Sequence, residues 1–361
     1  MRIRAGLTRK ERNVNEIKSL RERIAGTLFP EGIPRLWCPL LTHYREDGTV
    51  DIDRMIAHMR HISPDVEGFL IPGATSDGWK LSDEQSLMLV DCAVSMARRT
   101  GSHLLLGVLR PDARSMTALI DSMLRFLRKK TGIEDTMDCL AAAHVRGFTV
   151  CPPSGRGDDQ ESIYAELSAV ADMAVPLALY HIPFITKSKL APATFQRLVE
   201  QYHTIFLFKD SSGQDLIADA PGDHGGVFLF RGAEGNYSEA LKDSGGAYDG
   251  FLLSTANCFA GELAAIIDYV ERGAFPAAEY FSDAITNTVT EVNRLTSPLH
   301  SGNLYATTMK AIDHFYAFGP GAGREQGPLL HGSMRIPEKV IEATGTILRQ
   351  FDLMPARGYA V

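Results

Sequence analysis

Short apolar runs alternate with amphipathic stretches from about residue 34 onward. Runs of four to seven apolar-rich residues predict buried strands, whereas apolar positions at helical spacing predict helices between them. The strands are expected at residues 36–41, 66–72, 103–108, 147–151, 176–180, 205–208, 227–230 and 250–253. The helices are expected at residues 51–61, 82–98, 113–128, 162–173 and 192–201, with another running from the last strand to about residue 271.

This alternation places the chain in the α/β class and favours a closed parallel (β/α)8 TIM barrel. An open doubly wound sheet has the same repeat and is the alternative. That fold expects a glycine-rich turn after the first strand, but residues 42–48, with the sequence THYREDG, do not form such a turn. The closed barrel is therefore preferred.

Three regions are expected along the chain. Residues 1–33 are interpreted as an N-terminal helical extension and residues 34–272 as the barrel. Residues 273–361 are interpreted as a C-terminal helical region, with helices near 275–295, 303–318 and 336–351. The polar stretch 128–138 is interpreted as an insertion between the third helix and the fourth strand.

Composition narrows the class of protein. The 361 residues are 45% hydrophobic and 22% charged, as in ordinary globular domains. A net charge of −7 argues against nucleic acid as a partner. No apolar stretch reaches the ~18 residues of a membrane span, and the first 25 residues lack the apolar core of a secretory signal. Five cysteines without paired spacing indicate reduced thiols. We therefore expect a cytoplasmic protein without membrane contact.

The most informative residue is Lys209, which follows the apolar run at residues 204–208 and precedes Asp210-Ser211-Ser212-Gly213. A lysine that is partly desolvated at the end of a strand has its neutral amine form favoured, and a neutral amine can form a Schiff base. The alternative is an ordinary lysine whose ammonium group reaches solvent.

In a barrel the chemistry lies at the carboxyl ends of the strands. The other candidates at these ends are the small-residue loop 73–78, Tyr180, Gly232 and the segment 250–254. Each has a structural alternative, because glycine and serine also form ordinary turns and a tyrosine hydroxyl can simply meet water.

His58 and His61 lie three residues apart on a predicted helix, which is a spacing seen in metal ligands. No third ligand is evident in the sequence. We expect both to be surface residues and expect no metal site.

The strand-end motifs together resemble the dihydrodipicolinate synthase/N-acetylneuraminate lyase family of class I aldolases, over about residues 33–320. The matching segments are Arg45–Asp51, Gly73–Asp77 with the following Leu81–Glu84, Tyr180–Pro183, and Phe208–Gly213. Each is a weak signal alone, but their order along the chain and their strand-end positions make the resemblance strong.

The resemblance implies a (β/α)8 barrel with C-terminal helices, assembled as a homo-oligomer (dimer or tetramer). It implies that Lys209 forms an imine with pyruvate or another 2-keto acid, without a cofactor, and that Tyr180 shuttles protons. The substrate carboxylate would be held by Thr75 with the backbone around Ala74 and Ser76. The pocket around the keto acid would be lined by Gly232 and Leu252.

Several positions depart from the family pattern. Ala74 replaces the first threonine of the carboxylate loop, and Pro153-Ser154 replaces a tyrosine pair. Ser76 and Asp77 replace glycine and glutamate. Ile185 stands where the synthases have an arginine that binds the second carboxylate, so a bidentate cation is lost. After the seventh strand, Ala233-Glu234-Gly235 keeps one acidic residue of the two expected in sialic acid lyases. Dihydrodipicolinate synthesis is therefore not expected.

Three functions remain open. The first is an aldolase-type lyase that cleaves or forms a 2-keto-3-deoxy sugar acid or a similar keto acid through Lys209. The second is a dehydratase or hydratase-aldolase that uses the same imine. The third is a 2-keto-acid-binding protein that has lost turnover, consistent with the missing hydroxyl at Ala74.

Overall fold

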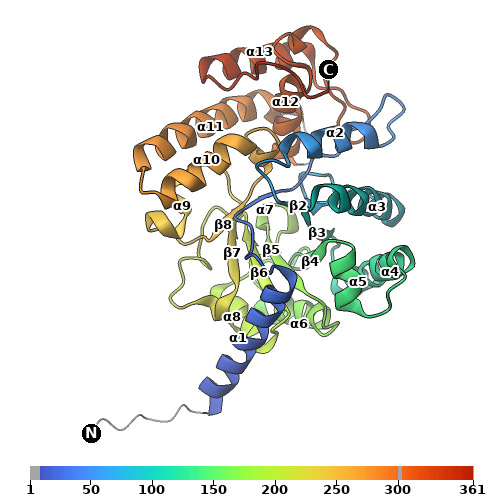
Figure 1. Ribbon diagram of the computed structural model, residues 1–361, viewed down its shortest axis with the longest axis vertical. Coiled ribbons are helices and arrows are strands. Elements are labelled where there is room, and N and C mark those ends of the chain that lie inside the picture. The colour runs from blue at the N-terminus through green and yellow to red at the C-terminus, as the bar shows by residue number, and fades with distance from the viewer. Residues whose placement is uncertain (1–8, 300–302, 361) are drawn as a thin grey trace.

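The computed structural model of the chain describes residues 9–299 and 303–360, and its centre is a closed barrel (Figure 1). Every strand is parallel to its neighbours, and their order around the barrel follows the chain. The strands are β1 (Leu36–Cys38), β2 (Gly68–Ile71), β3 (His103–Val108), β4 (Val145–Val150), β5 (Leu177–His181), β6 (Ile205–Asp210), β7 (Phe228–Arg231) and β8 (Gly250–Leu252). Because β1 pairs with both β2 and β8, the sheet closes, and the predicted (β/α)8 barrel is confirmed over an open sheet.

Helices surround the strands. They are α1 (Arg9–Leu28), α2 (Ile52–Ile62), α3 (Asp83–Thr100), α4 (Ala113–Thr131), α5 (Thr136–Ala142), α6 (Gln160–Ala171), α7 (Pro183–Thr186), α8 (Pro192–Gln201), α9 (Tyr237–Ala240) and α10 (Ala260–Glu271). Much of the predicted insertion is helical, since α4 continues to Thr131 and α5 begins at Thr136. Cys139 and Leu140 of α5 are buried, so α5 packs onto the core.

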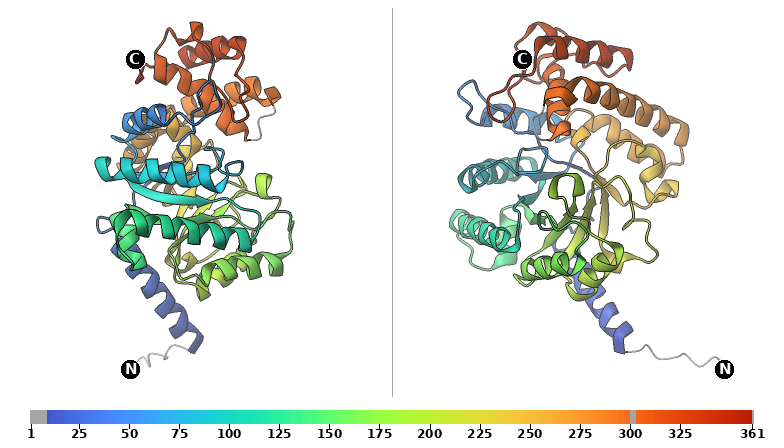
Figure 2. Two further views of the ribbon diagram at one scale, coloured as in Figure 1. Left: turned by 90° about the vertical axis from the view of Figure 1, so that its right-hand side faces the viewer. Right: turned by 180° about the vertical axis from the view of Figure 1, so that it is seen from behind.

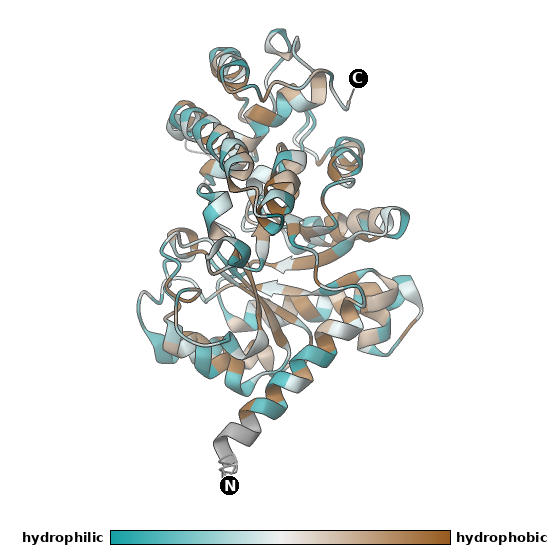
Figure 3. Ribbon diagram, turned by 60° about the vertical axis from the view of Figure 1, so that its left-hand side comes forward, coloured by the Kyte–Doolittle hydropathy of each residue, from teal (hydrophilic) through white to brown (hydrophobic). Residues whose placement is uncertain are grey.

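Local sequence determines where these helices begin and end. Ser82 and Gln85 form a reciprocal capping box at the start of α3, and Gly101 ends the helix in the left-handed conformation. Asp112 and Gly132 have the corresponding roles for α4. In Figure 3 the hydrophobic residues concentrate on the strands and on the helix faces toward them, as amphipathic packing requires.

Apolar side chains fill the barrel interior. Trp37 is fully buried there, and its indole N–H donates to the Pro34 carbonyl at 2.8 Å. A Cβ at Gly68, on the neighbouring strand, would come within 2.1 Å of the Trp37 ring, so only glycine fits beside it. The cluster also contains Leu28, Phe29, Leu70, Leu105, Ala178, Phe206, Leu207, Phe230 and Leu252.

Helix α1 and the C-terminal helices lie at opposite ends of the molecule (Figure 2), and α1 contacts α8 and β6. Arg21 of α1 is almost fully buried, and its guanidinium donates hydrogen bonds to the carbonyls of Val199, Tyr202, Ile205 and Gly225. These bonds satisfy a buried cation without a carboxylate, and they fix α1 to the segments around α8 and β6.

The C-terminal helices α11 (Phe275–Thr296), α12 (Leu304–Phe318) and α13 (Glu338–Gln350) pack on one another and on the barrel. The middle helix, α12, is buried along most of its length. No helix within residues 9–299 and 303–360 combines the length and apolar character needed to cross a membrane.

Candidate active site

Lys209 lies at the carboxyl end of β6, directly beside Tyr180 of β5 in the strand register. Its side chain points into the barrel mouth and is only 4% exposed. The Nζ atom sits 4.2 Å from the centroid of the Tyr180 ring. Lys209 makes no hydrogen bond or ion pair to any residue that the structure describes, so its amine is not committed to a structural partner.

The environment of Lys209 favours the neutral amine. Burial lowers the pKa of Lys209 to about 8, and the nearby Glu234 carboxylate opposes this shift. Burial also raises the pKa of the Tyr180 phenol, so the phenol keeps its proton. An amine with a lowered pKa and a protonated phenol are thus adjacent at the end of these strands.

A pair of buried side chains behind the site holds the ends of β5 and β6 together. His181 Nδ1 donates to Asp210 Oδ1 at 3.2 Å, because His181 Nε2 already accepts the Leu190 N–H. Since His181 and Asp210 follow Tyr180 and Lys209 directly, this pair fixes the alignment of the two residues that face the cavity.

A cavity of about 410 Å³ opens above Lys209. It brings together four of the predicted site residues: Thr75, Tyr180, Lys209 and Gly232. The other lining residues are Ile182, Phe184, Ser211, Ser212, Gly213, Ala233, Glu234, Ser254, Asn303, Leu304 and Tyr305. A larger cavity, of about 760 Å³, includes Phe29, Arg35 and His103 at the amino-terminal end of the strands. The smaller cavity is the candidate active site, because barrel enzymes place their chemistry at the carboxyl ends.

The loop after β2 offers donors for an anion. Thr75 lines the cavity, and the backbone N–H groups of Ala74 and Thr75 make no hydrogen bond to the described residues. Ser76 has a different role, since its hydroxyl donates to the Leu40 carbonyl and accepts the Gly73 N–H at 3.0 Å. Ser76 therefore shapes the loop and does not line the cavity, whereas Thr75 remains available to a carboxylate.

The two remaining predicted residues also differ in position. Leu252 does not line the cavity and packs in the barrel interior with Leu207 and Phe230. Gly232 lies against the catalytic candidate: a Cβ there would stand 2.6 Å from Lys209 Cε and 2.3 Å from Ser211 Oγ. The absence of a side chain at Gly232 leaves the room that the Lys209 side chain occupies.

Replacing Gly232 should therefore disturb Lys209 specifically. We expect Gly232→Ala to slow imine formation with pyruvate by about a hundredfold, because a displaced nucleophile loses its near-attack geometry. The rate can be measured by borohydride trapping. Gly261→Ala is the matched control, since the nearest atom to its Cβ would be at 3.7 Å. Equal rates in the two variants would contradict this role for Gly232.

Glu234, noted in the sequence as a partial motif, is the charged neighbour of Lys209. Its carboxylate accepts hydrogen bonds from Ser254 Oγ, from the Thr255 N–H at 3.2 Å, from Thr255 Oγ1 at 2.7 Å and from the Tyr237 hydroxyl at 3.0 Å. Four donors occupy the acceptor positions of the two oxygens. Glu234 is therefore held rigidly and acts on the cavity through its charge.

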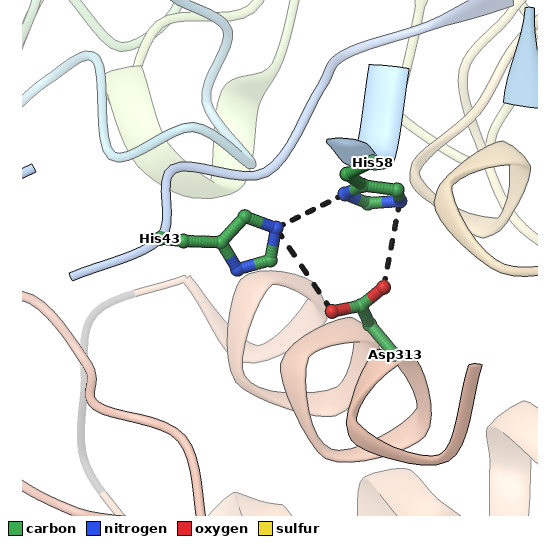
Figure 4. A group of neighbouring side chains, drawn as sticks. All are labelled: His43, His58 and Asp313. Carbon is green, nitrogen blue, oxygen red and sulfur yellow. Dashed lines mark hydrogen bonds and ion pairs between the residues drawn. The ribbon is translucent and has the colours of Figure 1, made fainter. Parts of the chain in front are cut away.

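The expectation that His58 lies on the surface is wrong. His61 is exposed, but His58 is fully buried, because α2 turns it toward His43 and Asp313 (Figure 4). His58 Nε2 donates to the Asn257 carbonyl at 2.7 Å, so its Nδ1 accepts from His43 Nε2 at 3.0 Å.

His43, His58 and Asp313 are residue types that bind metal ions. Their charges, however, are balanced without an ion. Asp313 Oδ2 pairs with the Arg54 guanidinium at 2.8 Å, and its Oδ1 accepts from the Tyr359 hydroxyl at 2.9 Å. Burial lowers the pKa values of His43 and His58, which keeps them neutral. A cation here would have to compete with Arg54 for the one carboxylate, so we interpret the cluster as a structural network.

Comparisons with known proteins agree with this geometry. The Dihydrodipicolinate synthetase family matches residues 141–300, which include Tyr180, Lys209 and Glu234. The 4-hydroxy-tetrahydrodipicolinate synthase of Synechococcus sp. (strain CC9605) is 30% identical over 192 residues, covering 52% of this chain and 57% of the relative. These matches, each over about half of this chain, support its assignment as a divergent relative of the dihydrodipicolinate synthase family.

Other synthases match this chain at lower identity. The synthase of Prosthecochloris aestuarii is 25% identical over 255 residues, covering 68% of this chain and 77% of the relative. The match spans only 57% and 58% of the Synechococcus and Symbiobacterium thermophilum synthases, respectively.

Solved structures share the fold of this chain. A prophage protein of the dihydrodipicolinic acid synthase family from E. coli K12, in complex with pyruvate, has a TM-score of 0.70 at 17% identity, covering 89% of this chain and 100% of that chain. The T. tenax protein named KD(P)GA has a TM-score of 0.68 at 17% identity, covering 88% and 99%.

Proposed function

We propose that this protein is a class I aldolase-type lyase in which Lys209 forms an imine with pyruvate or a related 2-keto acid. The observation that carries the proposal is the uncommitted amine of Lys209, buried at the cavity floor 4.2 Å from the Tyr180 ring centroid. Its pKa of about 8 supplies neutral amine near physiological pH. The proposal is also supported by the E. coli relative, whose structure contains pyruvate.

The reaction uses groups already placed around the cavity. The keto acid carboxylate binds to Thr75 and the free N–H groups of Ala74 and Thr75. The Lys209 amine attacks the keto carbon and a C–N bond forms. Tyr180 protonates the departing hydroxyl, so water leaves and a protonated imine remains. The Tyr180 phenolate then removes a proton from the adjacent carbon, which gives an enamine and restores the phenol. The enamine carbon attacks an aldehyde carbon, and Tyr180 gives its proton to the new alkoxide. Water adds to the re-formed imine and returns a proton to Tyr180, and the C–N bond breaks to release the product and the Lys209 amine. Cleavage follows the same steps in reverse.

Glu234 supports this chemistry electrostatically. The imine is a fixed cation, unlike the amine from which it forms, and a carboxylate nearby stabilises it in a desolvated cavity. Glu234 is the one anion and Lys209 the one cation among the described residues that line the cavity.

The same charge balance informs the choice of second substrate. A carboxylate or phosphate on the aldehyde would lie near Glu234 without a cation to pair with. Ile185, where the synthases have an arginine, packs against the apolar cluster that contains Tyr180 and Ile182. We therefore propose an uncharged aldehyde, and hence a 2-keto-3-deoxy sugar acid or similar compound as product, in place of dihydrodipicolinate synthesis.

Borohydride reduction in the presence of pyruvate tests the proposal. We expect a stable adduct mapped by mass spectrometry to the peptide that contains Lys209. An absence of adduct with pyruvate and with longer 2-keto acids would rule the proposal out. Release of an aldehyde from a 2-keto-3-deoxy sugar acid then distinguishes an aldolase from a dehydratase, and adduct formation without any turnover indicates a binding protein.

The pH dependence of trapping provides a second prediction. Only the neutral amine attacks, so the rate of adduct formation should rise with pH and level off above the Lys209 pKa of about 8. Between pH 6 and pH 8 the rise should be roughly fiftyfold, as the neutral fraction grows from about 1% to about half. The initial rate of trapping at limiting pyruvate gives this profile.

The variant Glu234→Gln tests the contribution of this carboxylate to the pH dependence. Because the Glu234 carboxylate raises the Lys209 pKa, its removal should shift the inflection to lower pH while slowing turnover. Glu239→Gln is the matched control, since Glu239 is exposed and does not line the cavity. An inflection that moves upward, or equally in both variants, would contradict the assigned role of Glu234.

A further inference from the structure

The N-terminal end of helix α12 contributes to the cavity. Its first residues, Leu304 and Tyr305, and the preceding Asn303 line the space above Lys209. The Asn303 side chain caps the helix by accepting the Tyr305 N–H at 3.1 Å. The C-terminal region is therefore part of the candidate active site and not only an appendage to the barrel.

Two ion pairs fix the position of α12. Lys310 Nζ lies 3.5 Å from Asp77 Oδ2, in the same loop that presents Thr75. One turn further along, Asp313 pairs with Arg54 of α2. Both α12 side chains are almost fully buried. A helix held by two buried ion pairs presents its first turn to the cavity in one orientation.

Tyr305 is the residue of this turn that can hydrogen-bond a substrate. It is half-buried against the core, and its hydroxyl has no hydrogen bond to another residue in the described part of the chain. Tyr305 and Glu234 line the same cavity, and burial together with the Glu234 charge raises the pKa of the Tyr305 phenol, so the phenol keeps its proton. Four donors already occupy the carboxylate oxygens of Glu234. The free hydroxyl of Tyr305 is therefore the better hydrogen-bond partner for a polar substrate group in this cavity.

We propose that Tyr305 is a specificity-determining residue, which selects an aldehyde with a hydroxyl group by hydrogen-bonding that hydroxyl. This inference rests on the proposed imine chemistry and adds the residue that recognises the second substrate. A site built to bond a hydroxyl discriminates against the analogue that lacks it, because the tyrosine is then left unpaired in a partly desolvated cavity.

Condensation of pyruvate with two aldehydes of equal chain length tests the proposal. Glyceraldehyde carries two hydroxyls and propanal carries none. We expect the wild type to prefer glyceraldehyde, and Tyr305→Phe to lower kcat/KM by about tenfold with glyceraldehyde but little with propanal. The rate of borohydride trapping with pyruvate should not change, because Lys209 and Thr75 are untouched.

Tyr269→Phe is the matched control, as Tyr269 is a half-buried tyrosine on α10 that stacks on Phe281 away from the cavity. Equal losses with both aldehydes in Tyr305→Phe would mean that Tyr305 only packs, and would overturn the inference. Failure of the wild type to condense glyceraldehyde, or to prefer it, would also overturn it. A wild type that traps no keto acid would instead refute the proposed function.

Discussion

Lys209→Ala should lose the borohydride-trapped adduct completely and lower any aldolase turnover by at least about a thousandfold. No other described cation lines the cavity, so no second amine can take over imine formation. The decisive readout is the mass of the protein after reduction with pyruvate. Residual turnover without an adduct would show that the reaction proceeds by another route.

Two further variants separate the loss of the amine from a loss of structure. Lys209→Met keeps most of the side-chain volume in this buried position, and it should fold with an unchanged thermal midpoint while forming no adduct. Lys189→Ala removes an exposed lysine, 63% of whose side chain is accessible, and should leave trapping unchanged. An adduct that persists in both Lys209 variants would place the Schiff base on a different lysine.

Asp313→Asn should lower the free energy of unfolding by about 3–5 kcal/mol, the range typical of breaking a buried ion pair. The carboxylate is 1% exposed and lies 2.8 Å from the Arg54 guanidinium. Its removal leaves Arg54 as a buried charge without a counter-ion. Urea denaturation gives the change directly from the midpoint and slope.

Glu161→Gln is the control for this charge removal. Glu161 also pairs with an arginine, Arg197, but both side chains are largely exposed. Exposed pairs contribute little to stability, so the midpoint should hardly move. An equally small shift of the midpoint in both variants would contradict this prediction. It would mean that the network around Asp313 does not hold α12 against the barrel.

The barrel could be predicted because short segments of the sequence determine its strands and helices. Parallel strands covered on both faces need continuous apolar runs, and eight such runs separated by amphipathic helices have few other solutions. The pairing of Lys209 with Tyr180 follows from the same logic. Both end consecutive strands, and consecutive strands of this barrel are neighbours.

Leu252, Ser76 and His58 occupy positions that the spacing of apolar residues along the chain could not predict. Strand alternation tells which face Leu252 occupies, but not whether it reaches the cavity or the interior beneath it. Ser76 could only be assigned to the loop once the Leu40 carbonyl was seen beside its hydroxyl. His58 seemed exposed because its partners, His43 and Asp313, come from two other elements of the chain.

Tyr305 was missed for a related reason. The spacing of apolar residues predicted a helix at 303–318, and α12 spans Leu304–Phe318. Its position relative to the cavity depends on long-range pairs such as Lys310 with Asp77. The detectable signal was the presence of charged residues, Lys310 and Asp313, on an otherwise apolar helix, since such residues are rarely buried without partners.

The contribution of α12 to the cavity has a consequence for the order of events during synthesis. The ribosome makes Lys209 and Tyr180 long before it makes Tyr305 and the residues that pair α12 with Asp77 and Arg54. In a nascent chain the Lys209 amine therefore lies in a cavity that lacks one wall until α12 emerges and docks. Docking of α12, and not closure of the barrel, is the step that completes the lining of this cavity.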